Sequence, residues 1–244
     1  MPLFFRVRLI ALVAISVASL FTSLRAQTPA AVAPAAPATG VTPTPKPPPS
    51  WEKEMEAFDV ADKASPPPEA PIVFTGSSSI RRWEGLAEDF AGYRVMNRGF
   101  GGSQLSDIRK HFDRVILRYR PRQVVIYSGS NDINAGKSVD VVVDDLKAIV
   151  TRIHQELPQT RILYISNALN PARWAQREKV REANRRIAEF LAQDPRDQYV
   201  DIVPAMLADN GEPKPDIFVA DRLHMNRKGY ELWIPVIKPR LVAP

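Results

Sequence analysis

Short apolar runs alternate with longer segments of helical periodicity over most of the chain beyond residue 70. The runs contain many β-branched and aromatic residues, as is typical of strands that are buried on both faces of a sheet. They are Ile72–Thr75, Tyr93–Asn97, Gln123–Ser128, Arg161–Ser166 and Tyr199–Val203. We therefore predict five strands.

The segments between these runs place apolar side chains three and four positions apart, which predicts amphipathic helices. One apolar face extends from Leu105 to Ile116, a second from Val139 to Leu157 and a third from Val180 to Leu191, and a last helix is expected from about Arg227 to Ile237. Alternation of strands and helices implies parallel strands that are joined by right-handed crossovers. The predicted fold class is α/β, a three-layer α/β/α sandwich around a central five-stranded parallel sheet.

The first residues have the pattern of a signal peptide, which we assign to residues 1–26. Arg6 and Arg8 precede an apolar run from Leu9 to Phe21. A transmembrane helix needs about 20 apolar residues, so this shorter run predicts no stable membrane span after cleavage. Leu24 stands where cleavage favours a small residue, and an uncleaved anchor is therefore the alternative.

Residues 27–50 consist largely of Pro, Ala and Thr and predict a disordered, extended linker without chemistry of its own. The composition changes at Trp51, and residues 51–244 form the expected folded domain. Its first element is a short helix over Trp51–Asp62, which ends before a run of three prolines.

Charge and cysteine content narrow the possible functions. The whole chain carries a formal charge of +6, but without the three arginines of the leader, 30 basic residues face 27 acidic ones, so a nucleic-acid-binding surface is not expected. The chain has no cysteine, which excludes disulfides and thiolate metal sites. Together with the leader, this composition fits a bacterial protein that is exported to the periplasm or the extracellular space.

Three polar, glycine-containing loops follow the first three predicted strands. They are Gly76–Ser79, Gly99–Ser103 and Gly129–Asp132. Ligands of parallel α/β sheets bind at the carboxyl ends of the strands, so these loops are expected to converge on one crevice. The serines of the first loop are candidate nucleophiles, although a simple strand-to-helix turn with a capping serine explains that loop equally well.

A serine nucleophile needs a base, and the chain has three histidines. His111 and His154 lie at the edges of apolar helical stripes, where a structural or surface role is expected. His224 follows the last strand in a loop, three residues after Asp221. An aspartate in that position can accept the imidazole Nδ1–H and leave Nε2 free to face a serine, whereas an isolated pair of this kind is often an ordinary turn.

An acyl-transfer site also needs hydrogen-bond donors for the oxyanion of the tetrahedral intermediate. Gly101–Gly102 and Asn131 stand in the loops that would supply such donors. Either feature alone is more often a flexible turn or a loop with local hydrogen bonds.

The four blocks in this order and spacing resemble the SGNH hydrolases, also called GDSL esterases and lipases. The blocks are Gly76-Ser77-Ser78, Gly101-Gly102, Gly129-Ser130-Asn131-Asp132 and Asp221-Arg222-Leu223-His224. The resemblance covers Trp51 to Leu241 and implies a flavodoxin-like sheet. It also implies a serine esterase that hydrolyses short-chain acyl or acetyl esters, on small molecules or acetylated carbohydrate, without a cofactor or a metal ion.

The resemblance assigns a role to each block. Ser78 would be the nucleophile, His224 the base and Asp221 the residue that orients it, while Gly102, Asn131 and the Ser78 backbone N–H would bind the oxyanion. Ser77 departs from the family's naming motif, in which aspartate is commoner at this position, and it resembles a Gly-Ser-Ser-Ser subgroup. The loss of that carboxylate leaves open which group replaces its contacts.

Other functions fit the sequence less well. Gln104 stands where a dinucleotide-binding fingerprint needs its last glycine, no Gly-Lys-Ser/Thr follows any strand, and the ligands of a metal-dependent phosphoesterase are missing. The alternative from another class is a catalytically silent carbohydrate-binding domain of the same fold. The intact serine, asparagine, aspartate and histidine of the four blocks argue against it. Oligomeric state cannot be read from the sequence.

Overall fold

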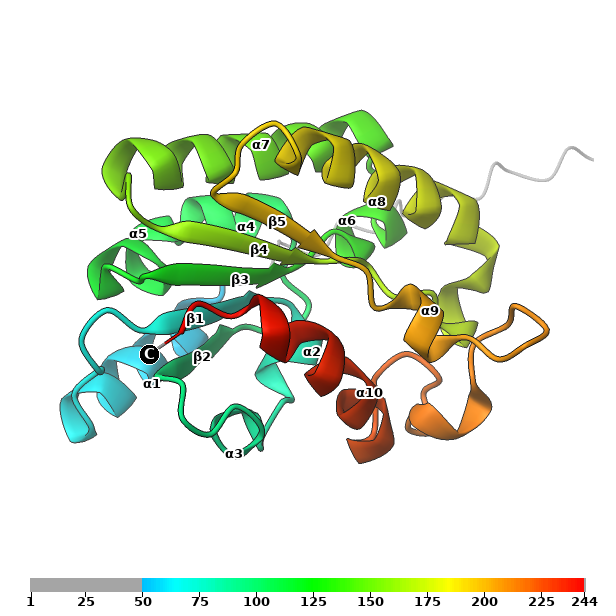
Figure 1. Cartoon of the computed structure of the whole chain (residues 1–244), viewed down its shortest axis with the longest axis horizontal. Coiled ribbons are helices and arrows are strands. Elements are labelled where there is room, and N and C mark those ends of the chain that lie inside the picture. The colour runs from blue at the N-terminus through cyan, green and yellow to red at the C-terminus, as the bar shows by residue number, and fades with distance from the viewer. Residues whose placement is uncertain (1–49, 244) are drawn as a thin grey trace, which may run out of the picture. The chain divides into compact units, whose positions relative to one another are not determined.

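The structure of the protein is a computed structural model that describes residues 50–243 (Figure 1). The expected signal peptide (1–26) and all but the last residue of the expected linker (27–50) lie outside the described residues.

A five-stranded parallel sheet forms the centre of the domain. Its strands are β1 (Ile72–Gly76), β2 (Val95–Gly99), β3 (Gln123–Tyr127), β4 (Arg161–Ile165) and β5 (Asp197–Val200). Their order across the sheet is β2-β1-β3-β4-β5, and all four pairings are parallel. This is the flavodoxin-like order, in which the direction of winding reverses next to β1. The predicted fold class is confirmed.

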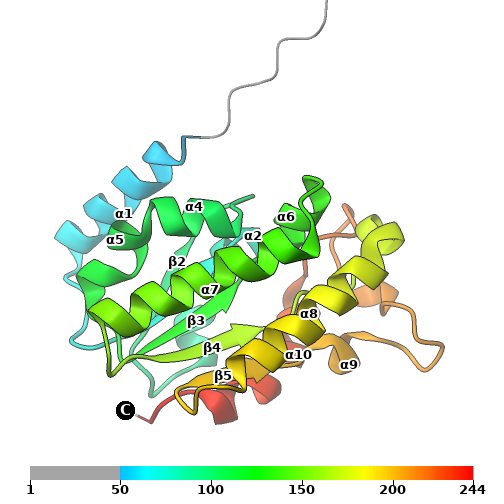
Figure 2. The same ribbon diagram turned by 90° about the horizontal axis from the view of Figure 1, so that it is seen from above.

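Helices cover both faces of the sheet. Helices α4 (Leu105–Lys110), α7 (Val139–Glu156) and α8 (Arg177–Leu191) pack side by side on one face, and α10 (Arg227–Ile237) lies on the other (Figure 2). The remaining helices are α1 (Glu52–Ala64), α2 (Ser78–Arg81), α3 (Leu86–Asp89), α5 (Phe112–Val115), α6 (Ser130–Asn134) and α9 (Val203–Met206), with 3-10 turns η1 (Leu117–Tyr119), η2 (Pro171–Gln176), η3 (Pro215–Ile217) and η4 (Lys238–Arg240). Within residues 50–243, none of the helices combines the length and the apolar character needed to cross a bilayer.

A cluster of large buried aromatic side chains lies between α10 and the sheet. Trp233 of that helix packs on Tyr127 of β3 with a ring separation of 4.9 Å, and Trp83 packs on Tyr230 at 4.8 Å. Phe74 of β1 stacks on Phe90 at 5.3 Å. Burial of aromatic side chains gives a large hydrophobic stabilisation, so this cluster fixes α10, and the turn that precedes it, against the sheet.

Two strands and one helix differ in extent from their predictions. β2 begins two residues later than predicted, and β5 begins two residues earlier. Both strands include polar residues, which a search for apolar runs does not assign to a strand. Arg98 of β2 is buried because it forms an ion pair with Asp62 of α1 and donates a 2.7 Å hydrogen bond to the Tyr119 hydroxyl. The helix expected from Leu105 to Ile116 is divided at His111 into α4 and α5.

Candidate active site

The turn after β1 depends on a glycine. Gly76 has a φ of +133°, and a Cβ atom at this position would lie 2.0 Å from the Tyr127 carbonyl oxygen of the neighbouring strand. The Ser77 N–H donates to that same oxygen at 3.0 Å, and α2 begins at the next residue. The chain can therefore turn sharply out of the sheet and present Ser78 at the carboxyl end of β1.

Ser78 is linked to His224 and Asp221 by two hydrogen bonds. The Ser78 Oγ lies 2.8 Å from Nε2 of His224, and the Nδ1 of the same ring lies 2.6 Å from Oδ2 of Asp221. The other carboxylate oxygen of Asp221 accepts the backbone N–H groups of Leu223 and His224, both at 2.9 Å. This continuous path from a carboxylate through an imidazole to a hydroxyl is the arrangement that activates a serine.

The three serines of the turn are not equivalent. Ser77 and Ser79 are buried, whereas Ser78 is partly exposed and is the serine whose hydroxyl contacts the imidazole. Of the three consecutive serines, Ser78 therefore remains the candidate nucleophile.

The carboxylate of Asp221 stays ionised in this arrangement. Its partial burial opposes ionisation, but the hydrogen bonds from the His224 ring and from the Leu223 and His224 backbone outweigh it and hold the pKa of Asp221 well below its usual range. The Asp221 side chain is 41% exposed and the His224 side chain 15% exposed. An ionised Asp221 fixes Nδ1 as the protonated ring nitrogen, so Nε2 can accept a proton from Ser78.

Gly102 lies in the loop after β2, and Asn131 lies in the first turn of α6, which follows β3; these two strands flank β1. The Asn131 Nδ2 donates to the Ser103 carbonyl at 3.0 Å, and the Ser103 hydroxyl donates to the Gly76 carbonyl at 3.1 Å. An amide nitrogen carries two N–H donors, so one contact to Ser103 leaves a second donor for another acceptor. Gly102 has a φ of +81°, and a Cβ there would lie 3.3 Å from the Trp51 ring. The three predicted loops are thus held together by hydrogen bonds.

The buried carboxylate of Asp132 also links these segments by hydrogen bonds. Its carboxylate accepts the Leu105 N–H at the start of α4 at 3.2 Å and pairs with the Lys137 ammonium at 2.8 Å. The Asp132 side chain is fully buried, and burial raises the pKa of Asp132 although Lys137 opposes that shift. Asp132 therefore has a positioning role between the Asn131 loop and the Gly102 loop.

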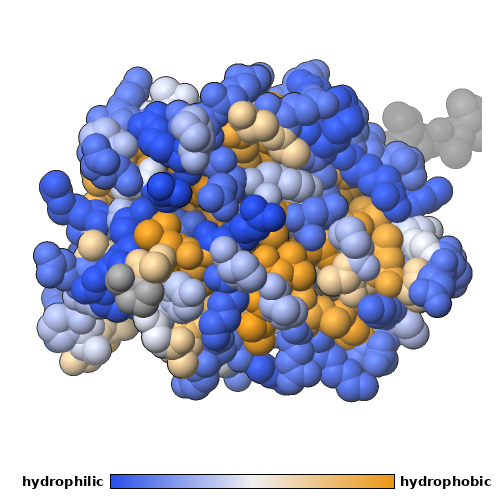
Figure 3. Space-filling model, viewed as in Figure 1, coloured by the Kyte–Doolittle hydropathy of each residue, from blue (hydrophilic) through white to orange (hydrophobic). Residues whose placement is uncertain are grey.

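A cavity of about 430 Å³ opens beside the His224 turn. Its walls include Trp174 and Phe218, two charged side chains, Arg222 and Glu212, and several prolines. On the face seen in Figure 3, apolar side chains reach the surface over α9 and α10. Trp174 belongs to η2, which follows β4, and the Arg177 guanidinium lies 5.2 Å from the Trp174 ring centre.

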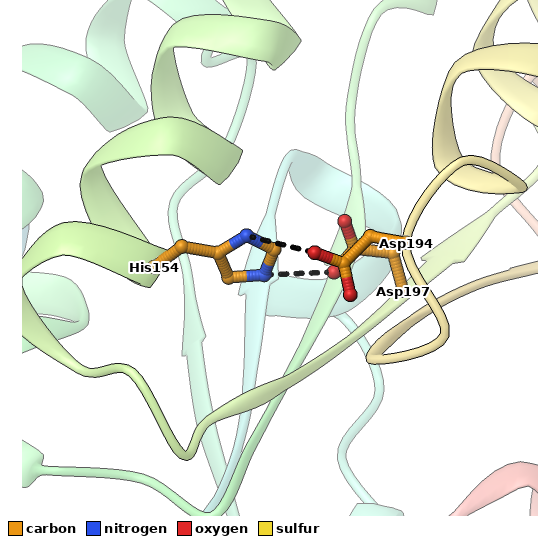
Figure 4. Close-up of side chains that lie close together, drawn as sticks. All are labelled: His154, Asp194 and Asp197. Carbon is orange, nitrogen blue, oxygen red and sulfur yellow. Dashed lines mark hydrogen bonds and ion pairs between the residues drawn. The ribbon is translucent and has the colours of Figure 1, made fainter.

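The other two histidines lie in structural surroundings, as expected. His111 is buried against Phe100, and burial lowers the pKa of His111. His154 lies between Asp194 and Asp197 (Figure 4), and its Nε2 is 3.0 Å from the Asp197 carboxylate. Such a cluster of three could ligate a cation, but Arg196 already donates to Asp194 at 2.6 Å and to the His154 Nδ1 at 3.2 Å. Because His154 lies in the last turn of α7 and Asp197 begins β5, this ion-pair network lies at the amino ends of the strands, opposite the Ser78 site.

Arg173 is the functional candidate that the sequence does not reveal. Its guanidinium donates to the Ser130 hydroxyl at 2.9 Å, next to Asn131. Ser103, the residue that links the three loops, also carries no signal beyond its place in a glycine-rich stretch. Both roles depend on contacts between distant segments.

Comparison with known proteins agrees with this geometry. The model of the GDSL-like lipase/acylhydrolase family matches residues 68–232. Platelet-activating factor acetylhydrolase IB subunit alpha1 of Bos taurus is 31% identical over 180 residues, which cover 70% of this chain and 74% of the relative.

Solved structures share the fold. A GDSL-like lipase from Bacteroides thetaiotaomicron superposes with a TM-score of 0.64 at 20% identity, covering 76% of this chain and 96% of that one. A mutant of an acetyl-xylooligosaccharide esterase from Geobacillus Stearmophilus gives a TM-score of 0.56 at 16% identity, covering 70% and 94%. The family match spans more than half of the chain and includes all of the residues of the Ser78 site. The chain belongs to the GDSL-like lipase/acylhydrolase family and is an ester hydrolase.

Proposed function

We propose that the protein is an exported esterase that hydrolyses short-chain acyl esters, acetyl esters above all, through an acyl-enzyme on Ser78. The observation that carries this proposal is the unbroken path of hydrogen bonds from Asp221 through His224 to the Ser78 hydroxyl. A serine hydroxyl is a weak nucleophile until a base takes its proton, and this path supplies the base.

In the first half of the reaction, Nε2 of His224 takes the proton of Ser78 as Oγ attacks the ester carbonyl carbon. The tetrahedral intermediate carries a negative oxygen, which the N–H groups of Ser78 and Gly102 and the second N–H of the Asn131 amide stabilise. Asp221 stabilises the imidazolium that forms. The proton then passes from Nε2 to the departing alkoxide, the C–O bond breaks, and an acyl group remains on Ser78.

In the second half, water takes the place of the alcohol. Nε2 of His224 removes a proton from water, and the hydroxide oxygen attacks the acyl carbon. The same donors bind the second oxyanion. Collapse of this intermediate returns the proton to Ser78 Oγ and releases the carboxylic acid, so the enzyme is regenerated without a cofactor.

The proposed substrates are small acetyl esters or acetylated carbohydrates. The names of two similar proteins, an acetylhydrolase and an acetyl-xylooligosaccharide esterase, both denote removal of acetyl groups. The cavity beside the His224 turn has a tryptophan and a phenylalanine among polar side chains, a composition suited to the apolar face and hydroxyls of a sugar. Export to the periplasm or beyond, which the leader sequence suggests, would bring the enzyme to such polymers.

A series of 4-nitrophenyl esters from acetate to decanoate, set beside acetylated xylan with acetate release as the readout, tests this proposal. We expect the highest kcat/KM with acetate or propionate and acetate release from the polymer, both lost in Ser78→Ala. A rate that rises steadily with chain length would contradict the short-chain assignment. No turnover of any ester by folded protein would instead favour a catalytically silent carbohydrate-binding domain.

A further inference from the structure

We propose that Arg173 binds a carboxylate on the substrate, so that the enzyme prefers acyl esters of acid-bearing alcohols, such as acetylated uronic acid units. This inference rests on the proposed esterase function of the Ser78 site. It adds a substrate-binding residue outside the four sequence blocks and a charge requirement for the alcohol portion of the ester.

The position of Arg173 follows from contacts on two sides. On one side, its Nη1 donates to the Ser130 hydroxyl at 2.9 Å, and Ser130 begins α6 directly before Asn131. On the other side, the neighbouring Ala172 N–H donates to the Arg222 carbonyl at 3.1 Å, inside the turn that carries Asp221 and His224. The Arg173 side chain therefore contacts the first residue of α6, and the backbone next to Arg173 is bound to the turn that supplies the base.

The local backbone holds Arg173 in this place. The Asn170 side chain accepts the Arg173 N–H at 3.0 Å, and Arg173 itself has φ −121° and ψ 25°, outside the helical region, within η2. Pro171 and Trp174, on either side of it along the chain, line the cavity beside the His224 turn. Arg173 thus stands in the chain between two residues that line the cavity proposed for the alcohol portion, and its side chain reaches the start of α6, next to Asn131.

The charge of Arg173 is not neutralised by the protein. Among residues 50–243, no carboxylate forms an ion pair with it, although the side chain is partly buried. Burial lowers the pKa of Arg173, and its positive charge is near enough to the buried Tyr127 hydroxyl to oppose the rise that burial causes in the pKa of Tyr127. A partly buried cation without a counter-ion is costly, and such groups are found where a ligand supplies the opposite charge.

A carboxylate fits the shape and the charge of this guanidinium. The planar fork of arginine matches the two oxygens of a carboxylate, and one hydrogen bond to Ser130 leaves further N–H donors for them. Arg222 and Glu212 bring opposite charges to the cavity wall, so the wall itself adds little net charge. One unpaired positive charge balances a single negative charge, whereas a doubly charged phosphate would remain half neutralised.

The test compares two acetyl esters that differ in charge and little in shape, 3-acetoxybenzoate and 3-acetoxybenzamide. For each, kcat/KM is divided by the rate constant of its hydrolysis by hydroxide, which removes the difference in leaving group. We expect wild-type enzyme to favour the benzoate by about tenfold at low salt, because a hydrogen bond to a charged group contributes a factor of this order. The preference should shrink in 0.5 M sodium chloride.

Arg173→Gln should reduce the preference to about one, and Arg173→Lys should retain part of it, because charge survives without the planar fork. Arg181→Gln, which removes an exposed arginine of α8, is the control for net charge and should keep the wild-type preference. Equal use of the two esters by wild-type enzyme, or an unchanged preference in Arg173→Gln, would overturn the inference and leave the esterase proposal intact. Failure of the esterase proposal looks different, since neither ester would then be hydrolysed above background and fluorophosphonate would not label Ser78.

Discussion

The imidazole Nε2 of His224 lies 2.8 Å from the hydroxyl of Ser78, although 146 positions separate the two residues. Ser78 follows the carboxyl end of β1. His224 precedes α10, and Trp233 of that helix packs on Tyr127 of the same sheet. The reactive pair therefore exists only when β1 and α10 are both in place, and the chemistry of the site is a property of the assembled sheet.

Replacing His224 tests the base. His224→Ala should lower kcat for 4-nitrophenyl acetate by about 10⁴-fold or more, because the Ser78 proton then has no acceptor. His154→Ala removes the histidine of the ion-pair network at the other edge of the sheet and is the matched control. A loss of similar size in both variants, measured on protein with a native circular dichroism spectrum, would contradict the assignment.

Replacing Asn131 tests the oxyanion donors. Asn131→Ala should lower kcat by about 10² to 10³ with little change in KM, as expected for an interaction made mainly in the transition state. Asn134→Ala, at the exposed end of the same helix, should keep wild-type kinetics. If Asn131→Ala raised KM alone, the amide would be a ground-state contact and not an oxyanion donor.

Gly76 is expected to be indispensable for the turn. Gly76→Ala should destabilise the domain by about 3 kcal/mol or more, for two reasons. Alanine is strained at a positive φ, and its Cβ would clash with the Tyr127 carbonyl oxygen. Gly136→Ala separates the two effects, since Gly136 has a φ of +90° and nothing within 4 Å of an added Cβ. Urea unfolding should show the smaller loss at Gly136, and equal losses would mean that the close contact is relieved elsewhere.

An ion pair beneath α10 should make stability depend on pH. Asp89 accepts two hydrogen bonds from Arg227, at 2.6 and 2.7 Å, and one from the Trp83 indole at 2.7 Å. The Arg227 contacts lower the pKa of Asp89 although burial opposes them, so the stabilisation is complete above the ordinary carboxyl pKa and is lost as pH falls through the lowered value.

Asp89→Asn should therefore cost about 1–2 kcal/mol at pH 7, a value reduced for the exposure of Arg227, and progressively less as the pH falls below 4. Urea unfolding of wild type and variant across that range measures the difference. Asp140→Asn breaks an exposed pair with Arg186 and should cost less at pH 7. A loss of unfolding free energy in Asp89→Asn that grows as pH falls would contradict the ion pair between Asp89 and Arg227 as the source of the pH dependence.

The sequence predicts the sheet well because its strands are short apolar runs and the helices between them have a clear periodicity of apolar residues. Polar strand residues are missed, since Arg98 and Asp197 are acceptable in strands only through partners on distant helices, Asp62 on α1 and His154 on α7. The end of β5 is likewise set by a tertiary contact, because the Asp201 carboxylate accepts both the Ser166 hydroxyl and the Val203 N–H.

The candidate site is predictable to the extent that its residues stand in recognisable blocks. Ser78, His224 and Asp221 belong to such blocks, and the structure brings all three together. Arg173 stands in no block. Whether Arg173 has an acidic partner depends on how η2 packs against α6 and the His224 turn. The local sequence pattern contains no information about that packing.

The most direct test of the account is the site of covalent labelling by a fluorophosphonate, mapped by mass spectrometry on the whole protein. We expect one adduct per chain, on Ser78, that is absent from Ser78→Ala and formed far more slowly in His224→Ala. An adduct on Ser77 or Ser79, or labelling that persists in Ser78→Ala, would contradict it.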